Sequence, residues 1–382
     1  MAAVLLVGAG LLLRSFWVLT SVEPGFDPNN VLTFQMSMPF ALDTINAERA
    51  GFYDEVLATI GEISGVESAA AITILPMEGG EIGAGLEIVG RPVPAGDRPT
   101  VRYNSVTPDY FGTMRIPLVR GRDFEGSDSR GRPGVAVINR ALADRFWPDG
   151  DPIGESLDPA ISFDLEGEPE VFEVVGIVEN VHERDLASEA RPQMYFSYWQ
   201  HTFPFMSFVV RTQTDAASLI GPIRDAVGRV DMDQPIFDIR TMDEYLARTM
   251  TSRRYPMILV GMFASLALLL ALVGIYGVIS YSVGQKTHEI GIRTALGAAR
   301  RDILTLVLAE GLRLALAGVG IGVVLALGLT RFLSSLLFGV GATDPVAFTG
   351  VPVILAVVAL IACLVPASRV VGVEPMVSLR NE

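Results

Sequence analysis

Three long uncharged runs constrain this chain more than any other feature of its sequence. The runs at 255–285, 345–368 and 314–330 contain 31, 24 and 17 residues without a charged side chain. A helix of 24 residues is roughly 36 Å long, which exceeds the roughly 30 Å hydrocarbon core of a bilayer. A helix in a soluble core rarely needs more than about 14 apolar residues. The runs therefore predict helices that span a membrane.

We expect three transmembrane helices in the region 255–382, at about 256–282, 305–331 and 347–368. A fourth span is predicted at 1–20. Its first thirteen residues are apolar, but thirteen are too few to cross a bilayer, and Arg14 follows them. Either this helix is the remainder of a longer one, or Arg14 reaches outward to the interface; we favour an incomplete first helix.

Charge is segregated along the chain and predicts its orientation. Residues 21–254 hold 37 acidic and 20 basic side chains, whereas the remainder holds 6 acidic and 9 basic ones. Short loops rich in Lys and Arg stay on the cytoplasmic side of a membrane. The segment 283–302 has four such bases, and two more follow the last helix. We therefore expect this loop and the C-terminus inside, and residues 21–254 outside, in the inner membrane of the cell.

The region 21–254 is predicted to be an extracytoplasmic domain of mixed α/β structure. A strand at 31–38, a helix at 47–63 and a strand at 66–75 form an opening βαβ pattern, and the same pattern recurs at 205–211, 216–230 and 235–239. Between these two halves the sequence is richer in Gly, Pro and charge, with short strands only. The pattern favours one βαβ pair split by an inserted β-rich lobe at about 79–200.

Several functional classes are excluded or disfavoured by composition. One cysteine, Cys363, rules out intrachain disulfides and cysteine metal sites, and the scattered histidines lack metal-ligand spacing. The only lysine, Lys286, follows Gln285 rather than the Gly of a Walker A loop. A formal charge of -14 disfavours nucleic-acid binding. We expect no catalytic, cofactor or metal residues, and no enzyme activity on this chain.

The cytoplasmic loop 283–304 is the most informative segment. Drawn as a helix, it places Ile292, Leu296, Ala299 and Ile303 on one apolar seam. This pattern predicts an amphipathic helix at the membrane surface. A passive helix lying on anionic lipid has the same pattern, so periodicity alone leaves both interpretations open.

A set of motifs resembles the MacB-like and FtsX-like permeases of ABC transporters. The loop contributes HEIGIRTALGAARRDIL at 288–304. The other matching motifs stand in the family's order: GAGLLLRSF at 8–16, PGFDPNNVL at 24–32, GRDF at 121–124, DPIG at 151–154, VVGIVENV at 174–181, LLFGVGATDP at 336–345 and PASRVVGVEPMVSLR at 366–380. The sequences of these motifs are most similar to one half of the duplicated permeases of acidobacterial type.

The resemblance implies four helices, a MacB-like periplasmic core domain at 21–254 and an FtsX-like permease domain at 255–382. It implies a permease that transmits ATP-driven motion of a partner ATP-binding subunit to the extracytoplasmic domain, for export or extraction of an envelope substrate. The loop would then be the coupling helix, with partner-binding residues Glu289, Ile290, Gly291, Ile292, Arg293, Leu296, Gly297 and Arg300. ATP would be bound by the partner, and a second permease half or a second copy would complete the transporter within membrane lipid. The alternative from another class is a membrane-anchored binding or scaffold protein without transport activity.

Overall fold

The computed structural model describes residues 1–38, 46–160, 171–285, 300–333, 337–341 and 343–371. The chain divides into two compact units. We call residues 1–22 with 251–382 the helical unit, and residues 23–250 the sheet unit.

The helical unit contains the four helices that are long and apolar enough to cross a membrane, within the part of the chain that the structure describes. They are α1 (Ala2–Thr20), α6 (Met242–Gln285), α8 (Arg300–Leu333) and α9 (Pro345–Val371). Their apolar windows have mean hydropathies between 2.0 and 2.7. The prediction of four spans is confirmed, and α1 continues through Arg14 as one 19-residue helix.

The helix α6 is much longer than its predicted span of 256–282. It has 44 residues and begins at Met242, before the apolar run. Its start is a capping box: the Glu244 amide donates to the Thr241 hydroxyl at 3.3 Å, and the Thr241 amide donates to the Glu244 carboxylate at 3.2 Å. Between this cap and Tyr255, Leu246, Ala247, Met250 and the arginines are good helix formers, so the chain reaches the apolar run already helical.

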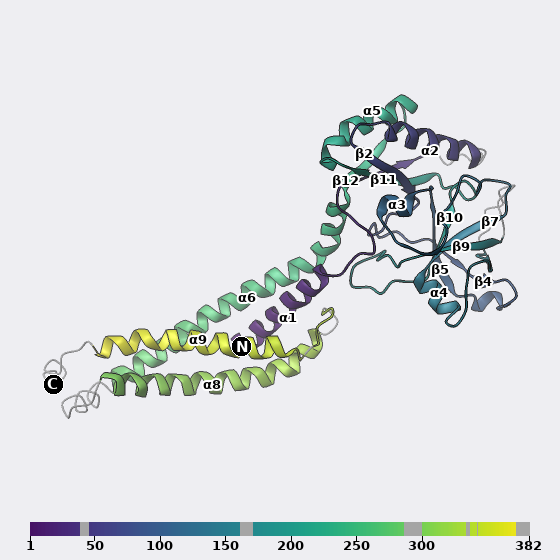
Figure 1. Cartoon of the computed structure of the whole chain (residues 1–382). Helices are drawn as coiled ribbons and strands as arrows, with labels where there is room; N and C mark the ends of the chain where they lie inside the picture. Colours follow the sequence, from purple (N-terminus) through teal and green to yellow (C-terminus); the bar gives the residue numbers. More distant parts are fainter. Residues whose placement is uncertain (39–45, 161–170, 286–299, 334–336, 342, 372–382) are drawn as a thin grey trace. The chain divides into compact units, whose positions relative to one another are not determined.

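The sheet unit is built on one mixed sheet (Figure 1). Its twelve strands are β1 (Val31–Ser37), β2 (Val66–Ile72), β3 (Gly83–Gly85), β4 (Glu87–Ile88), β5 (Thr100–Val106), β6 (Leu118–Gly121), β7 (Gly134–Asn139), β8 (Ser156–Asp158), β9 (Phe172–Val178), β10 (Gln193–Ser197), β11 (Phe205–Thr212) and β12 (Ile236–Thr241). Its helices are α2 (Asn46–Gly61), α3 (Tyr110–Met114), α4 (Arg140–Phe146) and α5 (Ile220–Val230), with 3-10 turns at Ala95–Asp97 and Ala216–Leu219.

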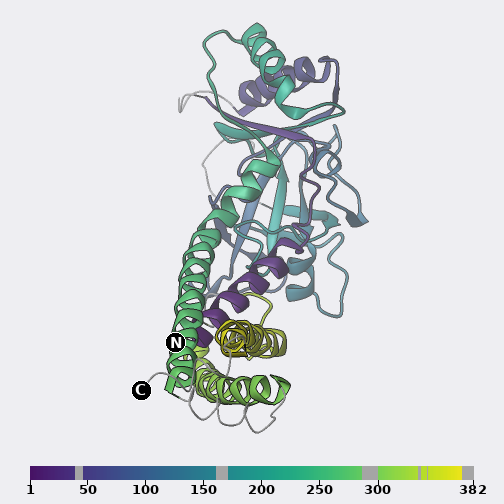
Figure 2. The same cartoon turned by 90° about the vertical axis from the view of Figure 1, so that its left-hand side faces the viewer.

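Four strands form the βαββαβ core that the sequence predicted as a split βαβ pair. Their order is β12-β1-β11-β2, and every neighbouring pair is antiparallel. The helices α2 and α5 lie together on one face of these strands (Figure 2). The elements β3 to β10 are inserted between β2 and β11 and continue the sheet beyond β2, through the pair Ile72 and Val106. The predicted β-rich insertion is therefore confirmed.

Two apolar clusters lie on opposite faces of the sheet, because side chains alternate along each strand. In β11, Phe208 and Val210 point to the cluster under α2 and α5, while Val209 points to the cluster under α3. Phe34 stacks on Phe208 with ring centroids 4.8 Å apart. The helix α2 adds Tyr53, whose hydroxyl donates to the Phe203 carbonyl at 3.0 Å. Each face is therefore closed by its own helices.

Candidate functional site

The predicted coupling residues fall almost entirely outside the described part of the chain. Glu289, Ile290, Gly291, Ile292, Arg293, Leu296 and Gly297 lie there, and Arg300 is the first residue of α8. The segment is flanked by the end of α6 and the start of α8. The two helices contact each other further along, where a Cβ on Gly311 of α8 would lie 3.1 Å from Ile279 Cδ1 of α6.

Three of the four membrane helices pack against one another. Ala3, Val7 and Leu11 of α1 share one buried cluster with Ala347 and other residues of α8 and α9: Ala326, Val351 and Leu355. The backbones come close as well. A Cβ on Gly10 would lie 3.8 Å from that of Ala347, and one on Gly322 would lie 2.5 Å from that of Ala3. Glycine at position 322 therefore permits the close approach of α1 to α8, whereas a Cβ at position 10 would make only an ordinary contact with α9.

Polar contacts join α1 to the connection between α8 and α9. Arg14 forms an ion pair with Asp344, whose side chain is 8% exposed. The Ser15 hydroxyl accepts a hydrogen bond from the Phe338 amide at 2.7 Å and donates to the Phe338 carbonyl at 3.3 Å. Asp344 also caps α9, because its carboxylate accepts from the Ala347 amide at 3.1 Å. We call these four residues, Arg14, Ser15, Phe338 and Asp344, the clamp.

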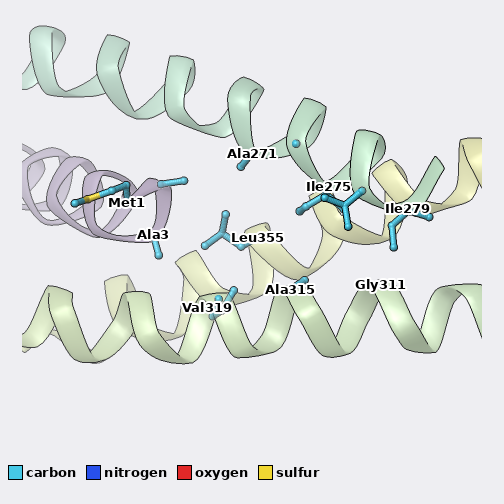
Figure 3. Close-up of a pocket in the computed structure, with 13 residues that line it drawn as sticks. Met1, Ala3, Ala271, Ile275, Ile279, Gly311, Ala315, Val319 and Leu355 are labelled. Atoms are coloured by element: carbon cyan, nitrogen blue, oxygen red, sulfur yellow. The ribbon is translucent and has the colours of Figure 1, made fainter. Parts of the chain in front are cut away.

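The helices α6 and α8 are much less buried than the other two. Their apolar windows are 6% and 12% buried, against 44% for α1 and 33% for α9. A cavity of about 420 Å³ separates part of α6 from α1, α8 and α9 (Figure 3). The α6 side of this cavity consists of apolar or small residues only, namely Ala271, Gly274, Ile275, Val278 and Ile279. At this cavity α6 presents no polar side chain, and its Ile279 is 3% exposed and lies against Gly311 of α8.

In the sheet unit, one buried arginine holds the segment that leads into β1, residues 23–30. Arg211 of β11 is 2% exposed. Its guanidinium donates to the carbonyls of Thr113 at 2.6 Å, Asn29 at 2.9 Å and Asp27 at 2.8 Å. It also lies 3.5 Å from the Asp27 carboxylate. Burial lowers the pKa of Arg211, and the pKa of Asp27 is lowered as well, because hydrogen bonds from Asn29 and the charge of Arg211 outweigh its burial.

The same segment contacts the inserted part of the sheet unit. The Asp27 amide donates to the Met114 carbonyl at 2.9 Å, and the His182 amide donates to the Pro24 carbonyl at 2.9 Å. Gly25 has a φ of +88°, and a Cβ there would lie 2.1 Å from the Asn180 carbonyl oxygen. Only glycine fits this position. Residues 23–30 are therefore fixed to both the βαββαβ core and the insertion.

One buried carboxylate in the sheet unit has a strongly shifted pKa. Glu183 is 9% exposed, and one of its oxygens has no hydrogen-bond partner. Burial raises the pKa of Glu183 to about 7, against the opposing charge of Arg102. It faces Tyr110 and Tyr195, two fully buried phenols. Within the described segments, no three His, Cys, Asp or Glu side chains are grouped as metal ligands would be.

Sequence reasoning missed the clamp and the role of Arg211. The sequence shows Arg14 as an interruption of an apolar run, and it predicted only that this side chain could reach the membrane interface. An ionisable side chain inside a membrane helix commonly pairs with another one. Asp344, directly before the apolar run of α9, was the available signal. Arg211 had no such signal, since it stands at the end of an ordinary strand pattern.

Two family models match this chain. The model described as MacB-like periplasmic core domain matches residues 4–226, and the model described as FtsX-like permease C-terminal matches residues 261–375.

Similar proteins with curated descriptions are transporter permeases. An uncharacterized ABC transporter permease, YvrN of Bacillus subtilis, is 25% identical over 291 residues, which cover 72% of this chain and 69% of YvrN. The pyoverdine export ATP-binding/permease protein PvdT of Pseudomonas savastanoi is 26% identical over 347 residues, covering 86% of this chain and 48% of PvdT. The macrolide export ATP-binding/permease protein MacB of Marinobacter nauticus is 24% identical over 284 residues, covering 70% of this chain and 41% of that MacB. The chain thus spans less than half the length of these two ATP-binding/permease relatives.

Among solved structures, the periplasmic region of MacB from Actinobacillus actinomycetemcomitans aligns with a TM-score of 0.39 and 12% identity, covering 61% of this chain and 98% of that one. The extracellular domain of YknZ from Gram-positive bacteria aligns with a TM-score of 0.33 and 14% identity, covering 52% and 91%.

Proposed function

The chain belongs to the family of MacB-like and FtsX-like ABC transporter permeases, and from that premise we propose that it transmits ATP-driven motion of a partner subunit to an extracytoplasmic domain. In this proposal the ATPase resides on the partner chain. The sheet unit lies outside the inner membrane and acts on an envelope substrate. A second permease half or a second copy completes the transporter.

The observation that carries the proposal is the pairing of an FtsX-like membrane region with a MacB-like domain between its first and second helices. A continuous helix of 44 residues, α6, joins the end of β12 to the predicted coupling loop. Motion of the loop would therefore reach the sheet unit through one covalent helix. The apolar window of α6 contains no charged residue between Tyr255 and Gln285, which suits transmission better than conduction of an ion.

The coupling loop supplies the decisive experiment. If the segment 288–304 docks into a groove of the ATPase, its apolar residues should be the anchors, because a desolvated aliphatic side chain contributes about 1.5–3 kcal/mol and a rim charge usually under about 1 kcal/mol. Ile292 and Leu296 should then matter most. Gly291 and Gly297 would allow close approach, and Glu289 with Arg293 would set the register.

We expect Leu296→Asp to lower partner-stimulated ATP turnover by at least about tenfold in a reconstituted complex, a loss of about 1.4 kcal/mol or more of coupling. Arg300→Gln should leave turnover near that of the unmodified protein. A helix lying passively on lipid predicts the opposite ranking, because loss of charge weakens its contact with anionic lipid. Unchanged turnover in Leu296→Asp would exclude the coupling role, and failure to bind any ATP-binding subunit would favour a membrane-anchored scaffold.

Orientation is tested separately by cysteine labelling in intact cells, in a Cys363→Ala background. Cysteines at Glu125 and Thr343 should react with an impermeant thiol reagent, and one at Thr294 should not. Both predicted outside positions are exposed within their own units. Labelling at residue 294 from outside would reverse the proposed topology.

A further inference from the structure

Two chain connections join the βαββαβ core of the sheet unit to its insertion. One is the segment 198–204, between β10 and β11, and the other is the segment 73–82, between β2 and β3. We call residues 73–82 the crossing segment. Its Met77 has a φ of +69°, a left-handed conformation that is unfavourable for a residue with a long side chain. The Met77 amide donates to the Glu183 carbonyl at 2.8 Å, so a contact with the insertion helps to hold this conformation.

A small cavity lies between the crossing segment, β5 and the loop that follows β9. It measures about 10 Å³, which is close to the smallest space that holds one water molecule. Its lining residues are Ile74, Gly80, Glu81, Ile82, Arg102, Tyr103, Asn104 and Glu183. Glu183 is 9% exposed, and its Oε1 has no hydrogen-bond partner among the described residues. A buried carboxylate oxygen in this position requires either a proton or a water molecule from the cavity.

The charges around this cavity do not keep Glu183 ionised at neutral pH. Among the lining residues, Arg102 supplies the positive charge, and its guanidinium also lies 3.2 Å from the Glu81 carboxylate. The phenols of Tyr110 and Tyr195, which face Glu183, are fully buried, and burial raises their pKa values, so both stay neutral. Burial outweighs the attraction of Arg102 and raises the pKa of Glu183 to about 7. This carboxyl therefore keeps its proton when exposed carboxyls have lost theirs.

We propose that the crossing segment is a proton-controlled latch, which stays closed over Glu183 while that carboxyl carries a proton and opens to admit water when the proton leaves. The proton passes to a water molecule, and hydration of the charged carboxylate then favours the open state over the closed one. Opening breaks the hydrogen bond of the Met77 amide to Glu183 and that of the Ile74 amide to the Asn104 side chain, and it lets the backbone of Met77 relax.

An open latch leaves the insertion attached to the core through the segment 198–204 and through residues 23–30, so the insertion can change its orientation. If the sheet unit lies outside the inner membrane, the pH of the cell envelope sets the latch. That last step alone rests on the proposed function.

Hydrogen exchange of backbone amides in the full chain, in detergent, measures opening of the latch. The amides of Ile74 and Met77 report on the crossing segment, since they donate to Asn104 Oδ1 at 3.1 Å and to the Glu183 carbonyl at 2.8 Å. The amides between β1 and β11 report on global unfolding. Each rate is divided by that of an unprotected amide at the same pH, which gives an opening constant. For the crossing segment this constant should rise about 100-fold between pH 4 and pH 8, and by no more than the roughly 300-fold that a pKa change from 4.5 to about 7 permits.

Three variants assign the proton. Glu183→Gln has no charge to lose, so its latch should stay closed at every pH, with the opening constant of the original chain at pH 4. Glu183→Asp retains a carboxyl and should restore the pH dependence, which a purely structural role of residue 183 does not predict. The exposed Glu189→Gln should behave as the original chain. A pH dependence that survives in Glu183→Gln would assign the proton to another group and overturn the proposal.

The unmodified chain decides the matter even if Glu183→Gln does not fold. The amides of Ile74 and Met77 should exchange faster than those between β1 and β11, because the latch opens without global unfolding. Equal opening constants for the two sets at every pH would mean that the crossing segment opens only when the whole sheet unit unfolds, and would exclude the latch. None of these measurements involves an ATP-binding subunit, so their outcome does not depend on the proposed function.

Discussion

The two units of this molecule bury charge in opposite ways. In the sheet unit, Arg211 is almost fully enclosed and donates to three backbone carbonyls from two separate segments. In the helical unit, one ion pair between Arg14 and Asp344 stands at the edge of otherwise apolar contacts. The first arrangement fixes several segments around one group. The second fixes one contact, between α1 and the connection of α8 to α9, beside a cluster of apolar side chains.

The largest effect is expected from removal of the enclosed arginine. Arg211→Met should destabilise the sheet unit by about 3–5 kcal/mol, because the carbonyls of Asp27, Asn29 and Thr113 lose their donors. Urea unfolding followed by the fluorescence of Trp147 and Trp199 measures this loss. Arg211→Lys is the matched control that keeps the charge, but its three donors sit on one nitrogen and cannot reach three carbonyls arranged around a planar guanidinium. If the Arg211→Met variant were as stable as the original chain, these hydrogen bonds would make no net contribution to the free energy of unfolding.

The next effect depends on pH and concerns Glu183. Burial raises the pKa of Glu183 from its ordinary value of 4.5 to about 7 in the folded state, so between these pH values the folded chain binds one proton more than the unfolded chain. Stability should therefore fall as pH rises from 4.5 to 7 and level off above 7, with a total loss of about 3 kcal/mol.

Glu183→Gln should remove this pH dependence, and so be more stable than the original by about 3 kcal/mol at pH 8 and about equal at pH 4. Unfolding curves at several pH values test it, with the exposed Glu189→Gln as control. The charged and titratable groups around Glu183 are Arg102, Tyr110 and Tyr195, and the two phenols are fully buried with raised pKa values. A pH profile that is identical in Glu183→Gln and the original chain would contradict the assignment.

A smaller effect tests the packing of the helical unit. Gly322→Ala should cost about 1–2 kcal/mol, since its Cβ would lie 2.5 Å from that of Ala3. Gly318→Ala has nothing within 4 Å and should be neutral or slightly stabilising, because alanine favours helix. Thermal unfolding in detergent compares them. Equal effects of the two changes would mean that α1 does not approach α8 as described.

The smallest effect is expected at the surface of the sheet unit. Arg120 and Asp151 form an ion pair at 2.6 Å, but both side chains are about half exposed. Solvent screens such a pair, so Arg120→Gln should change stability by less than about 0.5 kcal/mol. The urea midpoint should stay where it is. If Arg120→Gln lowered the stability as much as Arg211→Met, the buried and the exposed arginine would contribute equally, contrary to this prediction.

Much of the fold could be predicted because the periodic signals were strong. Phe52, Val56 and Ile60 at helical spacing gave α2, and the alternation of Leu32, Phe34 and Met36 with polar residues gave β1. The strand β11 followed from the repeated order of strand, helix and strand. Six elements of the insertion were missed: β3, α3, β6, α4, β8 and β10. The strand β10 has only five residues and is buried throughout, and α4 is a seven-residue helix whose start is marked only by the Asn139 cap. Short buried strands and short capped helices are stabilised by tertiary contacts rather than by local pattern.

The candidate site was less accessible from the sequence. The pattern of Ile292 and Leu296 predicts one apolar face of a helix. The surface that this face would contact is predicted to lie on a partner protein, so this chain's sequence cannot identify it. The contact of Arg14 with Asp344 joins residues 330 positions apart, so no local rule connects them. The helix α6 could have been extended to its real start, because Thr241 and Glu244 have the spacing of a capping box.

The order of strands in the sheet unit has a consequence during synthesis. The strand β1 pairs only with β11 and β12, and Val31 lies opposite Arg211, which is 180 positions later in the chain. At roughly 5–20 residues per second, a ribosome needs roughly 10–40 seconds to make that stretch. During this interval β1 has left the ribosome with both edges unpaired. We therefore expect pairing of β1 with a β11 from another copy to compete with folding of the single chain until its own β11 is made.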